Sequence, residues 1–294
     1  MNIYFYNAWH NGDLHVSRTF VRYIMENIKA ENYFYMHNNS PTVLQDIPNL
    51  HQQPYSLNIQ NKHGYFKRGN DVYINTWYCS YNNEYLNNNE MTIFVLINIF
   101  KRTLKELFGH EILNNPLYFL PRIDYTKFNV FKVDDLVAID TRKKVLICNN
   151  TADSGQSENF DFDPVIETIS NQYPDILFII SNKKRYIEKG NVRYCEDIIP
   201  YPNNLNEISY LSKFCSVIVG RLSGPQTFSA IQDNFLDSKK KIITFVKTGI
   251  NGYTFGDGSF GVTSLLPEGQ RATFIHSDNF RFENIVNTIS GELK

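Results

Sequence analysis

The most specific chemical signal in the sequence is a short polar turn at residues 221–227. It follows the apolar run at residues 216–220, which is typical of a strand buried in a parallel sheet, and it precedes a predicted helix. Ser223 suits the N-cap of that helix, and Pro225 has the φ angle that a first helical turn requires. Because such a helix start directs backbone N–H groups out of the carboxyl edge of a sheet, it favours an anion such as a diphosphate.

We therefore predict that a diphosphate binds at this turn, beside Arg221, whose guanidinium group could hold phosphate with two hydrogen bonds. The turn residues expected to contact the phosphate groups are Ser223, Gly224, Pro225, Gln226 and Thr227.

Further polar residues follow two other predicted strands of the same half of the chain. Asn150 and Thr151 come after the strand at residues 144–148, where they either contact phosphate or sugar or belong to an ordinary polar loop. Asn182 and Lys183 come after the strand at residues 176–181. Glu207 falls in the first turn of a predicted helix, a position where the helix dipole by itself favours an acid.

A second candidate site lies between a predicted strand at residues 2–9 and a helix at residues 14–28. Asp13 opens this helix, and its carboxylate either accepts the proton of a hydroxyl nucleophile as a general base or simply caps the helix. His10 and His15 are close enough in sequence to replace it as the base, or they bind an acceptor or pack.

Arg18 and Arg22 are predicted to lie on the polar side of the same helix. There they either contact a charged acceptor or remain solvated.

Strand-like apolar runs alternate with helix-like periodic segments along the chain, which predicts parallel sheets covered by helices. Residues 118–140 show no helical period and are interpreted as the crossing between two domains, residues 1–140 and 141–294. The remaining predicted strands span residues 31–37, 54–60, 70–78, 192–195 and 241–246, and the remaining predicted helices span residues 91–108, 164–173 and 279–293.

Two sequence patterns resemble a known family. The run Leu-Asn-Glu-Ile-Ser-Tyr-Leu at residues 205–211, followed by Val-Ile-Val-Gly-Arg-Leu-Ser-Gly-Pro at residues 217–225, resembles the nucleotide-sugar site of GT-B glycosyltransferases. It is most similar to the heptosyltransferase-like family, glycosyltransferase family 9, with some fucosyltransferase-like features. The family pattern has an acidic residue before the Ser-Gly-Pro and a His in the helix after it, whereas this sequence has Leu222 and Thr227.

The resemblance implies an α/β protein of the GT-B fold, with two Rossmann-like domains whose parallel sheets face a central cleft. It implies transfer of a sugar from a nucleotide-sugar donor, held by the second domain, to a hydroxyl of a glycan or other acceptor. The reaction would be inverting and independent of metal, with Asp13 as the base and with acceptor contacts from Asn11, Gly12 and Arg18. In that family Glu207 corresponds to an acid aimed at the ribose, and Asn182 and Lys183 stand where base or phosphate is held.

Two alternatives stay open on the sequence. The first is a nucleotide-sugar 2-epimerase of the same fold, which would convert its donor without an acceptor. The second is a non-catalytic nucleotide- or sugar-binding protein on a GT-B scaffold, which the missing acid at position 222 favours.

Composition narrows the class of protein. The chain has 294 residues, of which 42% are hydrophobic and 20% are charged, and this is typical of a globular protein. Its net charge of −1 argues against a general nucleic-acid binder. No signal peptide and no transmembrane segment are recognised, so a cytoplasmic location is expected.

No bound cofactor and no metal site are expected. Asp161 and Asp163 frame a phenylalanine in a polar loop before a helix, where capping is the better interpretation than metal binding. The Gly-rich segment at residues 256–261 matches a dinucleotide motif in letters only, because no buried strand directly precedes it.

Overall fold

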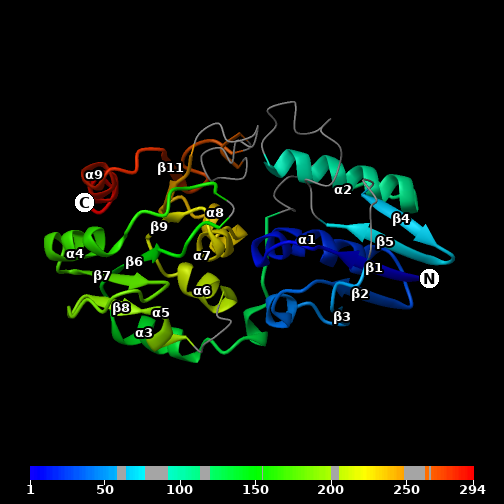
Figure 1. The fold of residues 1–294 in the computed structure, drawn as a ribbon, viewed down its shortest axis with the longest axis horizontal. Coiled ribbons are helices and arrows are strands. Elements are labelled where there is room, and N and C mark those ends of the chain that lie inside the picture. The colour runs from blue at the N-terminus through cyan, green and yellow to red at the C-terminus, as the bar shows by residue number, and fades with distance from the viewer. Residues whose placement is uncertain are drawn as a thin grey trace. The chain divides into compact units, whose positions relative to one another are not determined.

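The computed structural model describes residues 1–57, 64–76, 92–112, 120–153, 155–199, 205–247, 262–264 and 266–294, with side chains of the second helix described from Phe100 onward. The described chain forms two compact units, one comprising Met1–Asp124 and the other beginning at Tyr125 (Figure 1). The units divide earlier in the sequence than the predicted boundary at residue 140.

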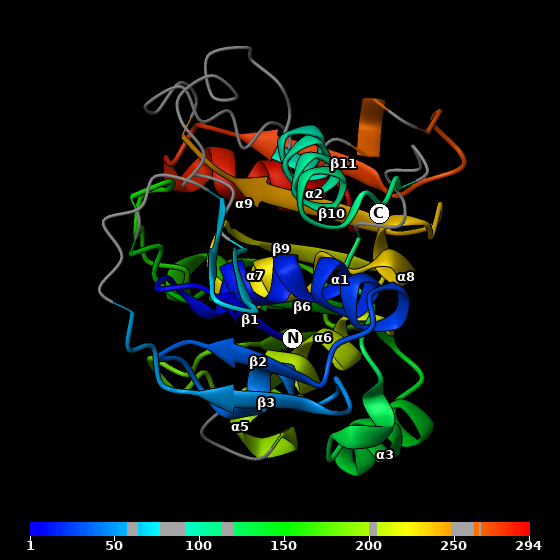
Figure 2. The ribbon, with the colours of Figure 1, turned by 90° about the vertical axis from the view of Figure 1, so that its right-hand side faces the viewer.

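Unit 1 contains a five-stranded sheet in the order β3-β2-β1-β5-β4. Four strands run parallel, and Figure 2 shows β1, β2 and β3 lying side by side, whereas β4 runs antiparallel to β5. The elements of unit 1 are β1 (Asn2–Tyr6), α1 (Asn11–Asn27), β2 (Asn32–Met36), the 3₁₀ helix η1 (Pro41–Leu44), β3 (Leu50–Gln53), β4 (Tyr65–Arg68), β5 (Asp71–Asn75) and α2 (Thr92–Phe108).

Helix α1 forms because apolar residues at helical spacing give it a continuous face. Phe20, Val21 and Ile24 are buried, and the ring of Phe20 stacks on that of Phe100 in α2 with centroids 3.6 Å apart. The two helices therefore pack against each other within unit 1.

A buried ion pair fixes α1 to the segment between η1 and β3. Arg18 is fully buried, and its Nη1 donates to Asp46 Oδ1 at 2.5 Å while its Nη2 donates to the Val43 carbonyl. Arg22 donates to the other oxygen of the same carboxylate, also at 2.5 Å. The prediction that Arg18 lies on a polar, solvated face is wrong, because Asp46 provides a buried counter-charge.

Unit 2 contains a six-stranded, fully parallel sheet in the order β11-β10-β9-β6-β7-β8. Its elements are η5 (Tyr125–Lys127), α3 (Phe131–Ile139), β6 (Lys143–Cys148), α4 (Asp163–Gln172), β7 (Ile176–Ile180), β8 (Val192–Tyr194), α5 (Cys195–Ile198), α6 (Leu205–Ser212), β9 (Val217–Arg221), α7 (Gly224–Phe228), α8 (Gln232–Phe235), β10 (Lys241–Phe245), η6 (Val262–Ser264), β11 (Thr273–Ser277) and α9 (Phe282–Gly291).

Both faces of the unit 2 sheet are buried. Alternate strand residues such as Val145, Phe178 and Val219 pack with α4 and α9, which lie next to each other in Figure 1. The intervening residues face the side that carries α7, where Gln226 of that helix bonds to Thr244 of β10. This two-sided burial explains why the strands read as continuous apolar runs.

Two sequence predictions are corrected by the fold. Residues 118–140 are not free of helix, because α3 forms there; only Val133 of this helix is buried, so its apolar period is weak. The strand predicted at residues 54–60 is absent from the described residues 54–57, and Leu50–Gln53 forms β3 instead. Strands β4 and β11 were not predicted from the sequence.

Cys148, Cys195 and Cys215 are buried free thiols, while Cys79 lies outside the described residues.

The buried ion pair leads to a stability prediction. Replacing Asp46→Asn is expected to lower the free energy of unfolding by about 3–5 kcal/mol, because Arg18 keeps its charge and loses its buried counter-charge. Urea denaturation measures the change. The control Glu167→Gln, which removes an exposed ion pair with Arg185, is expected to cost at most about 1 kcal/mol. Equal losses in the two variants would contradict this account of the pair.

Candidate functional site

The turn between β9 and α7 is built as a helix start on the carboxyl end of a buried strand. Ser223 occupies the N-cap position in an extended backbone conformation, with φ −132° and ψ −179°. Pro225 lies in the first helical turn. The first intrahelical hydrogen bond runs from the Thr227 N–H to the Ser223 carbonyl at 2.8 Å, so the preceding N–H groups of Gly224 and Gln226 lack intrahelical partners.

The Ser223 hydroxyl does not make the predicted capping bond. Its Oγ is buried and has no hydrogen-bond partner among the described residues. A buried polar group without a partner costs free energy, and a bound ligand oxygen at this turn would satisfy it.

Arg221, at the end of β9, is fully buried and directed toward the loop that follows β6. Its Nη1 donates to the Asn149 and Asn150 carbonyls at 2.8 and 2.9 Å, and its Nη2 donates to the Phe160 carbonyl. Its guanidinium also lies over the rings of Phe160 and Phe162, at 4.6 and 4.8 Å from their centroids. The predicted bidentate contact to phosphate would require Arg221 to leave these carbonyls.

The charge of Arg221 is retained at neutral pH. Burial lowers the pKa of its guanidinium to about 10, with an opposing effect from the carboxylate of Asp161. No carboxylate among the described residues lies within ion-pair distance of this side chain. A buried positive charge therefore lies near the turn, and its electrostatic effect reaches further than it would in water.

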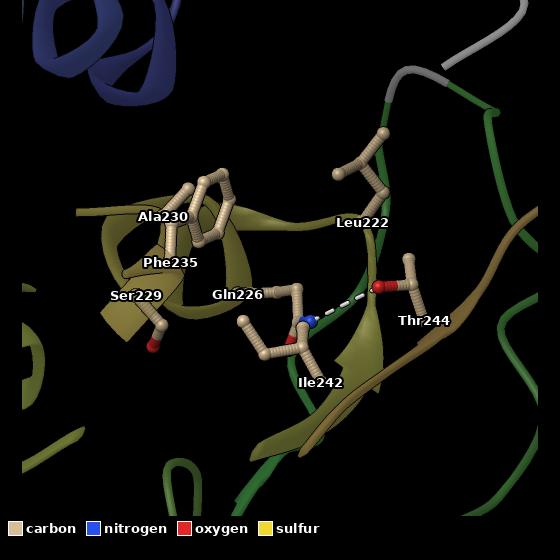
Figure 3. A pocket seen from close by; sticks show the side chains of 7 residues that line it. All are labelled: Leu222, Gln226, Ser229, Ala230, Phe235, Ile242 and Thr244. Carbon is tan, nitrogen blue, oxygen red and sulfur yellow. Dashed lines mark hydrogen bonds between the residues drawn. The ribbon is translucent and has the colours of Figure 1, made fainter. Parts of the chain in front are cut away.

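Gln226 points into the interior rather than out of the turn. Its Nε2 donates to Thr244 Oγ1 at 3.2 Å, and it lines a cavity of about 10 Å³ with the six other residues drawn in Figure 3. That volume suits one water molecule and no substrate. A ligand at this turn would therefore meet Gln226 through its backbone N–H group.

Asn149, which the sequence did not single out, connects the loops after β6 and β7. Its Nδ2 donates to the Asn182 carbonyl at 2.7 Å, and its Oδ1 accepts from the Asn182 N–H at 2.9 Å. Ser181 Oγ donates to Asn150 Oδ1 at 2.7 Å. The structure thus brings Asn150 and Asn182 together at one edge of the sheet, and Thr151 beside them is exposed. A polar residue directly after a strand was the only signal in the sequence for Asn149.

Lys183 and Glu207 have different surroundings. Lys183 pairs with Glu196 at 2.8 Å, and that hydrogen bond raises the pKa of Lys183. Glu207 lies on α6, which packs against α7, and its Oε2 is buried without a hydrogen-bond partner among the described residues. Burial raises the pKa of the Glu207 carboxyl. Glu207 Oε2 is thus, after Ser223 Oγ, a second buried oxygen without a hydrogen-bond partner among the described residues, and it lies on the helix that packs against α7.

In unit 1, Asp13 caps the start of α1. Its Oδ2 accepts from the His10 N–H at 3.1 Å, and its own N–H donates to the His10 carbonyl at 3.1 Å. Asp13 is half-buried, as are Asn11 and Gly12 in the same turn. The capping role is therefore present, and it is compatible with a further role for the carboxylate.

The two histidines near Asp13 are separated by burial. His10 is exposed beside the carboxylate, whereas His15 is fully buried on the inner side of α1. Arg18 is also buried, in its pair with Asp46, so it cannot contact an acceptor without breaking that pair. The sequence could not show the burial of Arg18, because the carboxylate that pairs with it lies 28 residues away along the chain.

Neither a metal cluster nor a membrane span is found in the part of the chain that the structure describes. No group of three or more His, Cys, Asp and Glu there could hold a metal ion, and no helix there has both the length and the apolar character to cross a bilayer. The Asp163 N–H donates to Asp161 Oδ1 at 3.0 Å, which is the predicted capping role. The Gly-rich segment at residues 256–261 lies outside the described residues.

Solved structures share the fold of this chain over its full length. E. coli ADP-heptose lps heptosyltransferase II matches with a TM-score of 0.53 at 10% identity, covering 100% of this chain and 98% of that one. The chain has the GT-B fold. E. coli heptosyltransferase WaaC with ADP-2-deoxy-2-fluoro heptose matches with a TM-score of 0.53 at 9% identity, covering both chains completely, at 100% each.

A glycosyl transferase of family 9 from Veillonella parvula also shares the GT-B fold, with a TM-score of 0.51 at 9% identity over 99% of this chain and 97% of that one. No protein-family model matches the sequence, and no curated protein matches it. The likeness therefore lies in the fold, as expected from the resemblance to heptosyltransferases.

The close packing beneath the turn leads to a second stability prediction. A Cβ at Gly220 would lie 2.6 Å from Cys148 Cβ and 2.7 Å from Gln226 Oε1, so Gly220→Ala is expected to cost about 1–3 kcal/mol of unfolding free energy. Gly190 has no heavy atom within 4 Å of a Cβ built there, and Gly190→Ala is expected to change stability by no more than about 0.5 kcal/mol. Urea unfolding of both variants tests the difference, and a Gly220→Ala protein as stable as the parent would refute the contact.

Proposed function

We propose that the protein is a glycosyltransferase that moves a sugar from a nucleotide-sugar donor to a hydroxyl of a glycan or other acceptor. The observation that carries the proposal is the turn at Ser223, where N–H groups at a helix start, a buried hydroxyl without a partner and a buried positive charge meet at the end of β9. The GT-B fold supports it, since a heptosyltransferase with this fold was solved with an ADP-sugar analogue.

In the proposed donor site, the diphosphate binds the N–H groups of Gly224 and Gln226 and the hydroxyls of Ser223 and Thr227. Arg221 holds the loop after β6 in place and contributes its charge from behind the turn. Pro225 supplies the backbone angle of the turn but no donor. Contacts to the sugar or the nucleoside would come from the edge formed by Asn150, Thr151, Asn182 and Lys183, and from Glu207 on α6.

In the proposed reaction, the acceptor oxygen forms a bond to the anomeric carbon as the bond from that carbon to the diphosphate oxygen breaks. The electron pair of the broken bond leaves with the nucleoside diphosphate, and the acceptor proton passes to Asp13. A single displacement of this kind inverts the anomeric centre. Positive charge at the turn stabilises the leaving diphosphate, so no metal ion is required by the proposal.

The test is incubation of the full chain with a panel of nucleotide sugars, with and without glycan acceptors and with EDTA present. Thermal shifts with the matching nucleoside diphosphates identify the nucleobase of the donor, since a ligand at 100 times its Kd stabilises the folded protein by about 2.7 kcal/mol. Ser223→Ala is expected to weaken nucleotide binding, and Ser290→Ala on α9 serves as the matched control. Epimerised donor without transfer, or binding without any turnover, would overturn the proposal, and loss of transfer on chelation would overturn its metal-free form.

The role of Asp13 is tested by Asp13→Asn, which keeps the size and the capping ability of the side chain. The transfer rate is expected to fall about 10²–10⁴-fold, the range for loss of a general base, while the melting temperature and donor Kd stay near those of the parent. Glu283→Gln, which removes another first-turn acid on α9, is the control and should leave the rate unchanged. A rate for Asp13→Asn within about threefold of the parent would exclude this base and point to His10.

A further inference from the structure

Strand β11 forms one edge of the unit 2 sheet and pairs with β10 alone among the described strands (Figure 2). The Thr273 N–H donates to the Lys240 carbonyl at 2.9 Å. At the other end of the strand, the Ser277 carbonyl accepts from the Val246 N–H at 3.0 Å. Because alternate residues of a strand bond to opposite sides, Thr273, Ile275 and Ser277 direct their backbone groups toward β10.

The two residues between them direct their backbone groups the other way. Phe274 and His276 therefore present an N–H and a carbonyl each along the outer edge of β11. No hydrogen bond of the described residues uses these groups. His276 is exposed and Phe274 is half-buried. The outer edge of β11 thus has the donors and acceptors that another strand needs.

Strand β11 has none of the features that commonly protect an edge. It reads Thr-Phe-Ile-His-Ser, with no Lys, Arg, acid or proline. The opposite edge of the same sheet, β8, is only three residues long and contains Arg193. In unit 1, the edge strand β4 carries Lys67 and Arg68, and β3 is a polar strand of four residues. Among the described edges, β11 is therefore the one best suited to pair with an additional strand.

The sequence of β11 is chemically symmetric about Ile275. In an antiparallel pair with a second copy, centred on Ile275, Thr273 lies opposite Ser277 and Phe274 lies opposite His276. The residues with outward backbone groups then face each other and exchange hydrogen bonds in both directions. Hydroxyl pairs and aromatic pairs are favourable across strands, and the central Ile275 meets its own copy.

The charges beside the strand match in the same arrangement. Arg271 precedes β11 and Asp278 follows it, so antiparallel pairing brings the arginine of one copy toward the aspartate of the other. Parallel pairing would instead bring like charges together. We propose that two copies of this chain associate through β11, with antiparallel strands related by a two-fold axis at Ile275. This association is independent of the proposed transferase reaction.

Sedimentation velocity of the full chain, from roughly 1 to 100 μM, tests the association. Pairing of two short strands buries less than the about 800 Å² per partner of a standard interface, so a reversible dimer is expected. His276→Pro removes an outward N–H that the fold does not use, and an edge strand tolerates proline at such a position. It is expected to raise the dimer Kd at least about 10-fold, because two symmetric hydrogen bonds are lost. His276→Tyr keeps the N–H and an aromatic ring, so it is the control and should dimerise like the parent.

Cross-linking tests the register, with Cys79→Ser as the background. Ile275→Cys places two thiols opposite each other in a non-hydrogen-bonded pair, with Cα atoms about 4.5 Å apart, which a disulfide can bridge. Copper phenanthroline, the oxidant, accepts the two electrons as both thiols lose their protons, and a covalent dimer is expected. Thr273→Cys is the control, because its two thiols would lie about 13 Å apart along the strands.

Three results would each overturn the proposal. They are a monomer at every concentration, a folded His276→Pro protein that dimerises as tightly as the parent, and equal cross-linking of Ile275→Cys and Thr273→Cys. If His276→Pro does not fold, the sedimentation of the parent and the two cysteine variants still decide.

Discussion

The carboxyl edge of the unit 2 sheet depends on the buried guanidinium of Arg221. The loops at the carboxyl ends of β6 and β9 belong to chain segments about 70 residues apart, and ladder hydrogen bonds end where the strands end. Arg221 joins them by donating to three carbonyl groups while packed against two adjacent phenylalanine rings. Burying this charge is costly, and only the complete set of carbonyls and rings offsets the cost. Arg221 therefore both holds these loops together and provides the positive charge at this edge of the sheet.

Unit 1 also contains a fully buried arginine, but a different interaction stabilises its charge. Arg18 is equally buried, but the carboxylate of Asp46 neutralises it at ion-pair distance. Unit 2 thus keeps a buried positive charge near its candidate turn, whereas unit 1 pairs its buried arginine with a buried carboxylate. The buried positive charge in unit 2 agrees with the anionic donor proposed for it.

The capping role of Asp13 and its proposed role as a general base are geometrically compatible. A helix start that follows a strand places the first-turn carboxylate at the sheet edge, and the hydrogen bond from the His10 N–H orients it. A general base also needs a fixed orientation, so the capping hydrogen bond is compatible with the proposed catalytic role of Asp13. His15, two residues after Asp13, is by contrast fully buried.

What the sequence by itself determined was local and periodic. The alternation of apolar runs with helical segments predicted two α/β halves, and the strand-turn-helix unit around Ser223 was correct because strand, N-cap and proline are encoded by neighbouring residues. Tertiary structure decided the surroundings of both arginines: Arg18 finds its carboxylate 28 residues away, and Arg221 finds its carbonyls 71 and 72 residues away. It also decided β3, a polar strand that exists because β2 offers it an edge, and α3, which buries little of its own surface. Local propensity sets which element a segment forms, but whether a charged side chain meets solvent, a carboxylate or a carbonyl depends on chain segments that only folding brings together.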